Sequence, residues 1–373
     1  MEKKRLIALA IVGLFLTGCG LATPNEESSS QSEVVSESSQ VESQEESSSE
    51  SESSSEPASE TASIATYFPF EENIAYSYIG EGIEYTSYDK YPQYIEDNRI
   101  QFTTNNGGTT IVEVLEYADG ALTQIFKRPE TYFRENMLDR TSEEGGTILL
   151  QEPLEVGTAW ASPAGSASEI TAIDAAIETA LGSYSAIEVT TTEGDAITKS
   201  YYAEGIGLVK EIFTDTAGTY EMSSTLETRK EGAPEAVVVR AFYPDANVMG
   251  LETSDINVAF NTNDVTRNTL TELFKQIPDV EYGRLIPDTA NIKSLYLNED
   301  GRVYVDFNQA LLTDMNAGSS GESLLLQGIV NTIGTYYGVE EVVLTVENEP
   351  YESGHFSFEK DEAMHVDLED VRE

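Results

Sequence analysis

The chain has 373 residues, of which 67 are acidic and 21 basic, and its formal net charge is −46. A surface this acidic repels phosphate backbones and anionic lipid headgroups, which argues against nucleic-acid binding and against membrane attachment by the protein surface. Cys19 is the single cysteine, so the sequence excludes internal disulfides, cysteine catalysis and cysteine-based zinc sites.

The amino terminus has the three parts of an export signal. Basic residues at 3–5 precede an apolar run over 6–16, and two small residues come before Cys19. The run is too short for a membrane span, which takes about 20 apolar residues. The stretch Leu16–Cys19 resembles the bacterial lipobox. An uncleaved signal anchor with an incidental cysteine is the alternative.

The lipobox resemblance implies that residues 1–18 are a signal peptide and that Cys19 becomes the lipid-bearing first residue of the mature protein. Its sulfur takes a diacylglycerol, and acyl chains such as palmitate hold the protein. Two acyl chains are enough for stable anchoring. We therefore expect a lipoprotein on the extracellular face of the cell membrane, which contacts the membrane through the lipid on Cys19.

Residues 19–63 are predicted to be a disordered tether. From Asn25 onward the segment is almost entirely Ser and Glu and has no aromatic residue. It has too little apolar surface to offset the entropy lost on ordering, and its like charges extend it. We expect the tether to lift the folded part off the membrane. A glycosylated or phosphorylated stalk is the alternative.

The pattern over residues 64–229 predicts an antiparallel β-rich domain with a curved sheet or half-barrel. Short strands alternate with Gly-, Asn- and Asp-containing turns at regular spacing, as in hairpins and meanders. The strands are predicted at residues 83–91, 94–104, 109–115, 121–126, 169–181, 184–192, 197–203 and 206–213. Pro129–Arg140 is predicted as a short helix.

A polar stretch at residues 226–235, with Gly232 and Pro234, predicts a domain boundary. Beyond it, residues 236–373 are predicted to form a two-layer α/β domain, which makes the chain α+β overall. Strands are expected at residues 236–243, 251–260, 291–297, 302–307 and 342–346, and helices over residues 265–276 and from about 319 to 337.

The ends of the two helices are predicted from capping residues. Residues 262–264 would cap the first helix, and Ser319 or Ser320 would cap the second with support from Glu322. Gly338 would end the second helix, because glycine adopts the left-handed conformation found there.

Four stretches of the second region resemble the GerMN family of sporulation and spore-germination lipoproteins. They are residues 241–245, 285–288, 300–307, and 318–324 together with 329–333. They follow the family's order over residues 237–357. The resemblance implies an extracytoplasmic, envelope-associated protein with interaction as its theme, and it supplies no catalytic residues. Residues 346–350 depart from the family's usual turn, which concerns the geometry of the final hairpin.

The sequence offers no clear catalytic or metal site. His355 and His365 are interpreted as surface or tail residues, because metal-ligand spacing is absent. Gly318–Gly321 fits helix capping better than a nucleophile elbow or an anion site. Asn298–Gly301 is interpreted as a hairpin turn and not as a calcium loop. We expect no catalytic residue, no cofactor and no metal.

Tyrosines are dense between residues 67 and 94. Exposed tyrosines could stack on the sugars of cell-wall glycan, whereas tyrosines in strands often serve packing. The residues concerned are Tyr67, Tyr76, Tyr78, Tyr85, Tyr88, Tyr91 and Tyr94.

Three functions are compatible with these features. The first is a non-catalytic envelope lipoprotein that binds a protein or cell-wall partner. The second is a carrier of a small hydrophobic molecule in the curved sheet, which requires an apolar cavity. The third is a wall hydrolase that uses paired carboxylates. The acidic charge is explained by solubility, with attraction of cations or of a basic partner as the alternative.

Overall fold

The computed structural model describes residues 63–143, 145–163, 165–277, 283–369 and 371–372. The signal peptide, Cys19 and the tether up to residue 62 lie outside the described residues, so those predictions stay predictions. All that follows concerns the described residues of the unit at 60–373. Within the described ranges, no helix has the length and apolar character needed to span a membrane.

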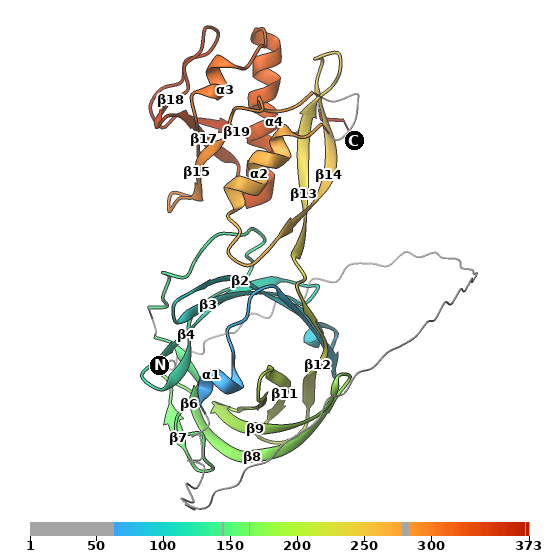
Figure 1. The fold of residues 1–373 in the computed structure, drawn as a ribbon, viewed down its shortest axis with the longest axis vertical. Coiled ribbons are helices and arrows are strands. Elements are labelled where there is room, and N and C mark those ends of the chain that lie inside the picture. Colours follow the sequence, from blue (N-terminus) through green and yellow to red (C-terminus); the bar gives the residue numbers. More distant parts are fainter. Residues whose placement is uncertain (1–62, 144, 164, 278–282, 370, 373) are drawn as a thin grey trace, which may run out of the picture. The chain divides into compact units, whose positions relative to one another are not determined.

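Twelve antiparallel strands form one sheet that curves strongly, and Figure 1 shows them arranged around a ring. Their order is β6-β5-β4-β3-β2-β1-β12-β11-β10-β9-β8-β7. The strands are β1 (Ile74–Glu81), β2 (Tyr88–Glu96), β3 (Arg99–Asn105), β4 (Thr110–Ala118), β5 (Ala121–Arg128), β6 (Thr147–Gln151), β7 (Ala159–Ala161), β8 (Ala167–Thr179), β9 (Gly182–Glu193), β10 (Ala196–Ala203), β11 (Gly207–Asp215) and β12 (Glu221–Glu231).

Side chains join the two end strands of the sheet, β6 and β7. The Trp160 indole N–H donates to the Ile148 carbonyl at 3.0 Å, and the Ile148 N–H donates to the Ser162 hydroxyl at 2.8 Å. These bonds satisfy part of the polar backbone that the ends of an open sheet leave unpaired. The expected antiparallel curved sheet is therefore confirmed, and its curvature goes beyond a half-barrel to a nearly closed form.

Aromatic and aliphatic side chains fill the interior of this sheet. Helix α1 (Ile64–Tyr67) lies inside the ring in Figure 1, and its Ile64 is buried. Phe68 follows the helix and packs edge-on against Phe102 and Tyr202, each at 6.2 Å between ring centroids. A cavity lined by Phe68 and Phe102 measures only about 20 Å³, which is room for about one water molecule.

Charged groups also lie inside the sheet, and they bind one another. Lys90 Nζ lies 2.5 Å from Glu113 Oε1 and 4.2 Å from the centroid of the buried Phe102 ring. Gln124 donates to the other Glu113 oxygen at 2.6 Å. Nearby, the Ser200 hydroxyl donates to Glu211 at 3.1 Å. The interior of the sheet therefore satisfies its charges with groups of the same sheet.

Several sequence predictions in this region were wrong. Residues 83–91 are not one strand, because a short 3₁₀ helix, η1 (Glu84–Thr86), precedes β2. Residues 94–104 contain a hairpin turn, where Asp97 adopts a φ of +49° between β2 and β3. Residues 226–231, placed in the boundary stretch, belong to β12.

Pro129–Arg140 contains no helix, because its side chains alternate between solvent and tertiary partners. Tyr132 is exposed, whereas the neighbouring Arg134 is only 2% exposed. The Arg134 guanidinium lies 2.6 Å from a Glu235 oxygen and donates to the carbonyls of Gln93 and Asn261 at 2.6 and 2.9 Å. A buried charge held this fully fixes the backbone in an irregular path.

The second region begins with the hairpin of β13 and β14 and continues into a mixed sheet of order β15-β16-β17-β18, in which β16 and β17 are parallel. Its elements are β13 (Glu235–Pro244), β14 (Leu251–Phe260), α2 (Thr266–Lys275), β15 (Ile292–Leu297), β16 (Val303–Phe307), α3 (Ala310–Thr313), α4 (Ser319–Tyr337), β17 (Glu341–Val346), β18 (Glu349–Pro350) and β19 (Ala363–His365). The predicted order of strands and helices is present, with α3, β18 and β19 added.

Helix α4 packs closely on β13 because of Gly328. A Cβ atom at Gly328 would lie 2.5 Å from the Phe242 carbonyl oxygen and 2.7 Å from a Leu285 methyl carbon. Both distances are below van der Waals contact, so the backbone of α4 can approach only where the side chain is absent. The side chain of Leu285 therefore packs directly against α4 at this glycine.

The predicted helix caps were partly wrong. Gly318 precedes α4 and Val265 precedes α2, and neither helix start has a side-chain cap. Ser319 instead begins α4 as a helical residue, and Glu322 turns toward other partners. Gly338 does end α4, with the left-handed φ of +69° that was expected.

The final hairpin forms despite its unusual sequence. Glu347 and Asn348 both have positive φ, +55° and +64°, as a tight two-residue hairpin turn requires. The Asp306 carboxylate holds this turn, since its Oδ1 accepts from the Asn348 N–H and from the Thr345 hydroxyl, each at 2.7 Å. The departure at residues 346–350 therefore preserves the hairpin geometry.

Candidate functional site

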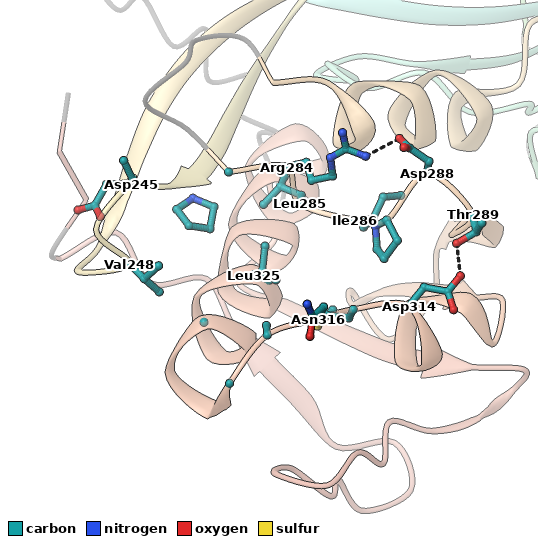
Figure 2. A pocket seen from close by; sticks show the side chains of 18 residues that line it. Asp245, Val248, Arg284, Leu285, Ile286, Asp288, Thr289, Asp314, Asn316 and Leu325 are labelled. Carbon is teal, nitrogen blue, oxygen red and sulfur yellow. Dashed lines mark hydrogen bonds and ion pairs between the residues drawn. The ribbon is translucent and has the colours of Figure 1, made fainter.

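A groove of about 940 Å³ opens among three loops of the second region (Figure 2). The loop after β13, the residues 283–289 after α2, and the residues 314–318 between α3 and α4 form its walls. Three of the four stretches that resemble the GerMN family contribute to it, namely residues 241–245, 285–288 and 318–324. Segments far apart in the sequence thus meet at one surface.

Asp245 shapes one end of the groove. Its Oδ1 accepts from the N–H groups of Asn247 and Met249 at 2.9 and 3.0 Å, which folds the loop after β13 into a tight turn. Its Oδ2 contacts the guanidinium of Arg372. The turn presents Val248, which is 44% exposed, at the same end of the groove (Figure 2).

The floor of the groove is apolar. Leu285 and Ile286 are buried, and both of their N–H groups point to the Phe274 carbonyl at the end of α2, at 3.0 and 3.3 Å. Leu325 reaches the groove from α4, and Pro287 adds to the floor. These backbone bonds hold the loop in place, so the floor is preformed.

Asp314 lies at the opposite end of the groove. The Thr289 hydroxyl donates to its Oδ2 at 2.5 Å, and the Thr313 hydroxyl donates to its Oδ1 at 2.8 Å. These hydrogen bonds lower the pKa of Asp314, so its carboxylate is firmly ionised at neutral pH. Among the described residues, no cation lies within ion-pair distance of it.

The third carboxylate of the rim, Asp288, is neutralised by its own loop. Arg284 lies 2.6 Å from Asp288 and lowers the pKa of that carboxyl. Both side chains are well exposed, so the pair is screened by water and contributes little to stability. The groove therefore combines an apolar floor with an ionic rim, which is the composition of a binding site.

The serine-rich stretch before α4 contributes backbone and no reactive hydroxyl to the groove. Gly318 and Gly321 line it, whereas Ser319 and Ser320 do not and are exposed to solvent. The nucleophile elbow and the anion site weighed from the sequence find no support in this geometry. In the part of the chain that is described, no group of three His, Cys, Asp or Glu side chains could hold a metal.

His355 is a surface residue, as predicted, with 41% of its side chain exposed, but it also has a partner that the sequence did not suggest. Its Nδ1 lies 2.5 Å from Glu322 Oε2, and the Tyr351 hydroxyl donates to the other Glu322 oxygen at 2.7 Å. Burial raises the pKa of Glu322, but hydrogen bonds from Ser353, His355 and Tyr351 outweigh burial and lower the pKa overall. No local pattern signals a pair separated by 33 residues. His365 is a surface residue, as expected, with 72% of its side chain exposed.

The turn at Asn298–Gly301 joins β15 and β16, as expected of a hairpin. The Asp300 carboxylate accepts from the Arg302 guanidinium at 2.7 Å and from the Tyr304 hydroxyl at 2.9 Å. Desolvation opposes ionisation here, but these hydrogen bonds win and lower the pKa of Asp300 to about 2. Arg302 thus occupies the carboxylate that a calcium ion would need.

The tyrosine cluster does not form a sugar-stacking surface. Tyr76, Tyr78, Tyr91 and Tyr94 are 5–8% exposed and belong to the cores. Only Tyr85 of the seven is strongly exposed, at 47%. Packing in the strands therefore explains the density of tyrosines, and the stacking interpretation was wrong for the group.

Several solved structures are similar to parts of the chain. The first GerMN domain of the sporulation protein GerM from Bacillus subtilis is 15% identical, with a TM-score of 0.27, and covers 34% of this chain and 97% of its own. A candidate lipoprotein from Clostridium perfringens is 13% identical, with a TM-score of 0.24, and covers 35% of this chain and 87% of its own.

A candidate exported protein with a YmcC-like fold from Bacteroides fragilis is 10% identical, with a TM-score of 0.27, and covers 44% of this chain and 98% of its own. No curated protein matches the chain. The family model named Germane, described as "Sporulation and spore germination", matches residues 240–352. This range includes the loops after β13 and α2 and the start of α4, which together form the groove. Residues 240–352 of this chain are therefore a Germane domain.

Proposed function

We propose that the chain is a non-catalytic, extracytoplasmic lipoprotein, anchored through Cys19, that binds an envelope partner in the groove of its Germane domain. It would be a two-domain α+β protein with the boundary between β12 and β13, at residues 232–234. The observation that carries the proposal is the meeting of three family-like stretches at one preformed groove. A role in sporulation is not part of the proposal, because one type of domain can serve proteins of different cellular processes.

The two alternatives have less support. A carrier of hydrophobic molecules needs an apolar cavity in the curved sheet, and the cavity lined there by Phe68 and Phe102 measures about 20 Å³. A larger hollow of about 1020 Å³ along β1 and β2 is also lined by charged groups, among them Lys90, Arg134 and Glu235. A wall hydrolase needs a proton donor and a free carboxylate, whereas two of the three carboxylates that line the groove already contact arginines.

Site-specific photo-crosslinking in intact cells tests the proposal. A photoreactive residue at Asn316, which is exposed in the groove, is expected to give a discrete adduct with an envelope partner. The matched control is the same residue at Leu181, 45% exposed in the turn between β8 and β9. The proposal fails if Asn316 gives no adduct, or gives the same products as Leu181.

A side chain built into the groove provides a second test. In Gly321→Leu, the first added carbon has ordinary contacts of 3.4 Å with Ala317 and 3.7 Å with Val248, so the leucine fills the groove while the fold is kept. Replacing a helical glycine also favours the helix, by up to about 1 kcal/mol. The adduct from Asn316 should disappear. Ser320→Leu, one residue earlier on the exposed face, should leave it intact.

The anchor is tested separately. Cys19→Ala removes the sulfur that takes the lipid, so the protein should leave the membrane fraction and appear in the soluble extracytoplasmic fraction. Because Cys19 is predicted to begin the tether, the thermal unfolding of the folded regions should be unchanged. Cys19→Ala protein that stays in the membrane fraction with its signal peptide removed would contradict lipid anchoring; the size of the protein on a gel separates this result from retention by an uncleaved signal.

A further inference from the structure

We infer that the groove binds a protein segment that places an aliphatic side chain against Val248, Met315 and Leu325 and a lysine or arginine against Asp314. The inference rests on the proposed function, since it names the chemistry of the partner at the same groove. It favours a basic protein segment over cell-wall glycan, the two partner classes that the sequence leaves open.

The charge of Asp314 is the first observation that supports a cationic partner. Two threonine hydroxyls orient its oxygens and keep the carboxylate ionised, at 2.5 and 2.8 Å. The other two carboxylates of the groove contact Arg284 and Arg372, whereas Asp314 has no cation beside it among the described residues. An oriented, ionised carboxylate at the rim of an apolar surface is a position for a cationic side chain from a partner.

The apolar lining of the groove is the second observation, and it supports an aliphatic side chain in the partner. Val248, Met315 and Leu325 offer accessible apolar surface beside the buried Leu285 and Ile286, and no aromatic side chain is among the described residues that line the groove. Sugar recognition uses aromatic faces, on which the rings of a glycan stack. A volume of about 940 Å³ is in the range of ligand pockets and takes several residues of a peptide.

A contact within the chain shows that the rim accepts an arginine from an extended segment. Arg372 runs beside β14, donating its N–H to the Leu251 carbonyl at 2.9 Å and accepting from the Thr253 N–H at 3.0 Å. This pairing brings its guanidinium onto the Asp245 carboxylate. Arg372 thus contacts the carboxylate at one end of the groove, and the inferred partner would make a similar contact with Asp314 at the other.

The net charge of −46 favours the same class of partner. Long-range attraction concentrates basic segments near an acidic protein and raises their association rate. An anionic ligand at the start of α4 would face repulsion from Asp314 and from Glu322 in the first helical turn. A cation-bearing segment has neither cost.

The experiment uses the full chain in intact cells, with the photoreactive residue at Asn316, and identifies the captured segment by mass spectrometry. The captured segment should contain a lysine or arginine within a few residues of an aliphatic residue. Asp314→Lys should lower the adduct yield about tenfold, the loss expected for a charge-assisted contact. Asp195→Lys changes the net charge equally at a distant turn and should leave the yield unchanged.

Purified full-length protein and two short labelled peptides give the second readout. Both peptides have a Leu-Leu centre, flanked by lysines in one and by glutamates in the other. The lysine peptide should bind at least about tenfold more tightly, and Asp314→Asn should remove most of the difference. Chitotetraose, as a glycan probe, should not displace the peptide.

These experiments distinguish a failure of the inference about the partner's chemistry from a failure of the proposed function. If the Asn316 adduct persists in Asp314→Lys, or if the captured segment is acidic or a glycan, the inference is overturned while the proposed function stands. Equal binding of the two peptides also overturns it. If no adduct forms in the parent protein, the proposed function itself fails.

Discussion

The twelve-stranded sheet and the Germane domain treat their polar and apolar groups in opposite ways. Inside the sheet, Lys90 binds Glu113 and aromatic rings close the space around them. In the Germane domain, aliphatic side chains line an open groove, and Asp314 has no cation beside it among the described residues. A region that satisfies its own groups has little to offer a partner, whereas unsatisfied groups at a preformed surface are what a partner can complete.

Arg134→Ala should give the largest effect on stability. Arg134 is 2% exposed and joins the residues after β5 to Glu235 at the start of β13. Its removal leaves the Glu235 carboxylate buried without a cation, which costs about 3–5 kcal/mol of unfolding free energy. Urea unfolding monitored by circular dichroism measures the loss. As a control, Arg140→Ala at an exposed position should change stability by less than about 0.5 kcal/mol. An equally small loss in Arg134→Ala would show that the contacts of Arg134 do not stabilise the fold.

Glu113→Gln should test whether the interior of the sheet depends on its own ion pair. Burial raises the pKa of Glu113, but attraction to Lys90 and the hydrogen bonds from Lys90 and Gln124 outweigh it and lower the pKa overall. The carboxylate therefore stabilises the fold above its ordinary pKa of about 4.3, and that contribution is lost as the pH falls through the lower folded value. We expect a loss of about 3 kcal/mol at pH 7 that shrinks in acid. A loss independent of pH would contradict this assignment.

Gly328→Ala should test the close approach of α4 to β13. The added methyl carbon would meet the Phe242 carbonyl oxygen and Leu285, so we expect a loss of about 2 kcal/mol, typical of overpacking. Leu285 should also move, so peptide binding in the groove should weaken. Gly321→Ala in the same helix has ordinary contacts and should be neutral or stabilising. Equal stability of the two variants would show that α4 can shift without cost.

Glu211→Gln should give the smallest effect, opposite in sign to Glu113→Gln. Burial raises the pKa of Glu211, so folding favours its protonated form. Its contribution to stability is present at low pH and is lost as the pH rises through the raised folded value. A neutral glutamine should therefore stabilise the protein at pH 7 by up to about 1 kcal/mol, with no gain near pH 4. Unfolding at both pH values measures the difference, and destabilisation at pH 7 would contradict it.

The sequence predicts those elements whose residues interact with near neighbours in the chain. Helical spacing and Gly338 place the end of α4 correctly, and tight turns place β8 to β11. Pro129–Arg140 fails because Arg134 binds groups 41, 101 and 127 residues away, which no local pattern contains. The prediction that Glu322 supports a helix cap fails for the same reason, since its partners Tyr351 and His355 come from beyond α4.

The candidate site shows the same limit. Asp245, the Leu285–Asp288 stretch and the Gly318 stretch are each recognisable from the sequence as parts of a family resemblance. These stretches meet at one groove because α4 packs closely on β13, and the distance between these two elements cannot be predicted from the sequence. The role of Asp314 is visible only in three dimensions, because its hydrogen-bond partner Thr289 lies 25 residues earlier.

The bond between Trp160 and Ile148 gives the protein a built-in optical reporter. Trp160 is the only tryptophan of the chain, and its indole N–H spans the contact between β6 and β7. Opening of this contact exposes the indole to water and shifts its emission, while events in the Germane domain occur without a tryptophan nearby in the sequence. Tryptophan fluorescence therefore reports only on the contact between β6 and β7, whereas circular dichroism reports on the secondary structure of the whole fold. Comparing the two signals during unfolding reveals whether the sheet and the Germane domain melt together or one after the other.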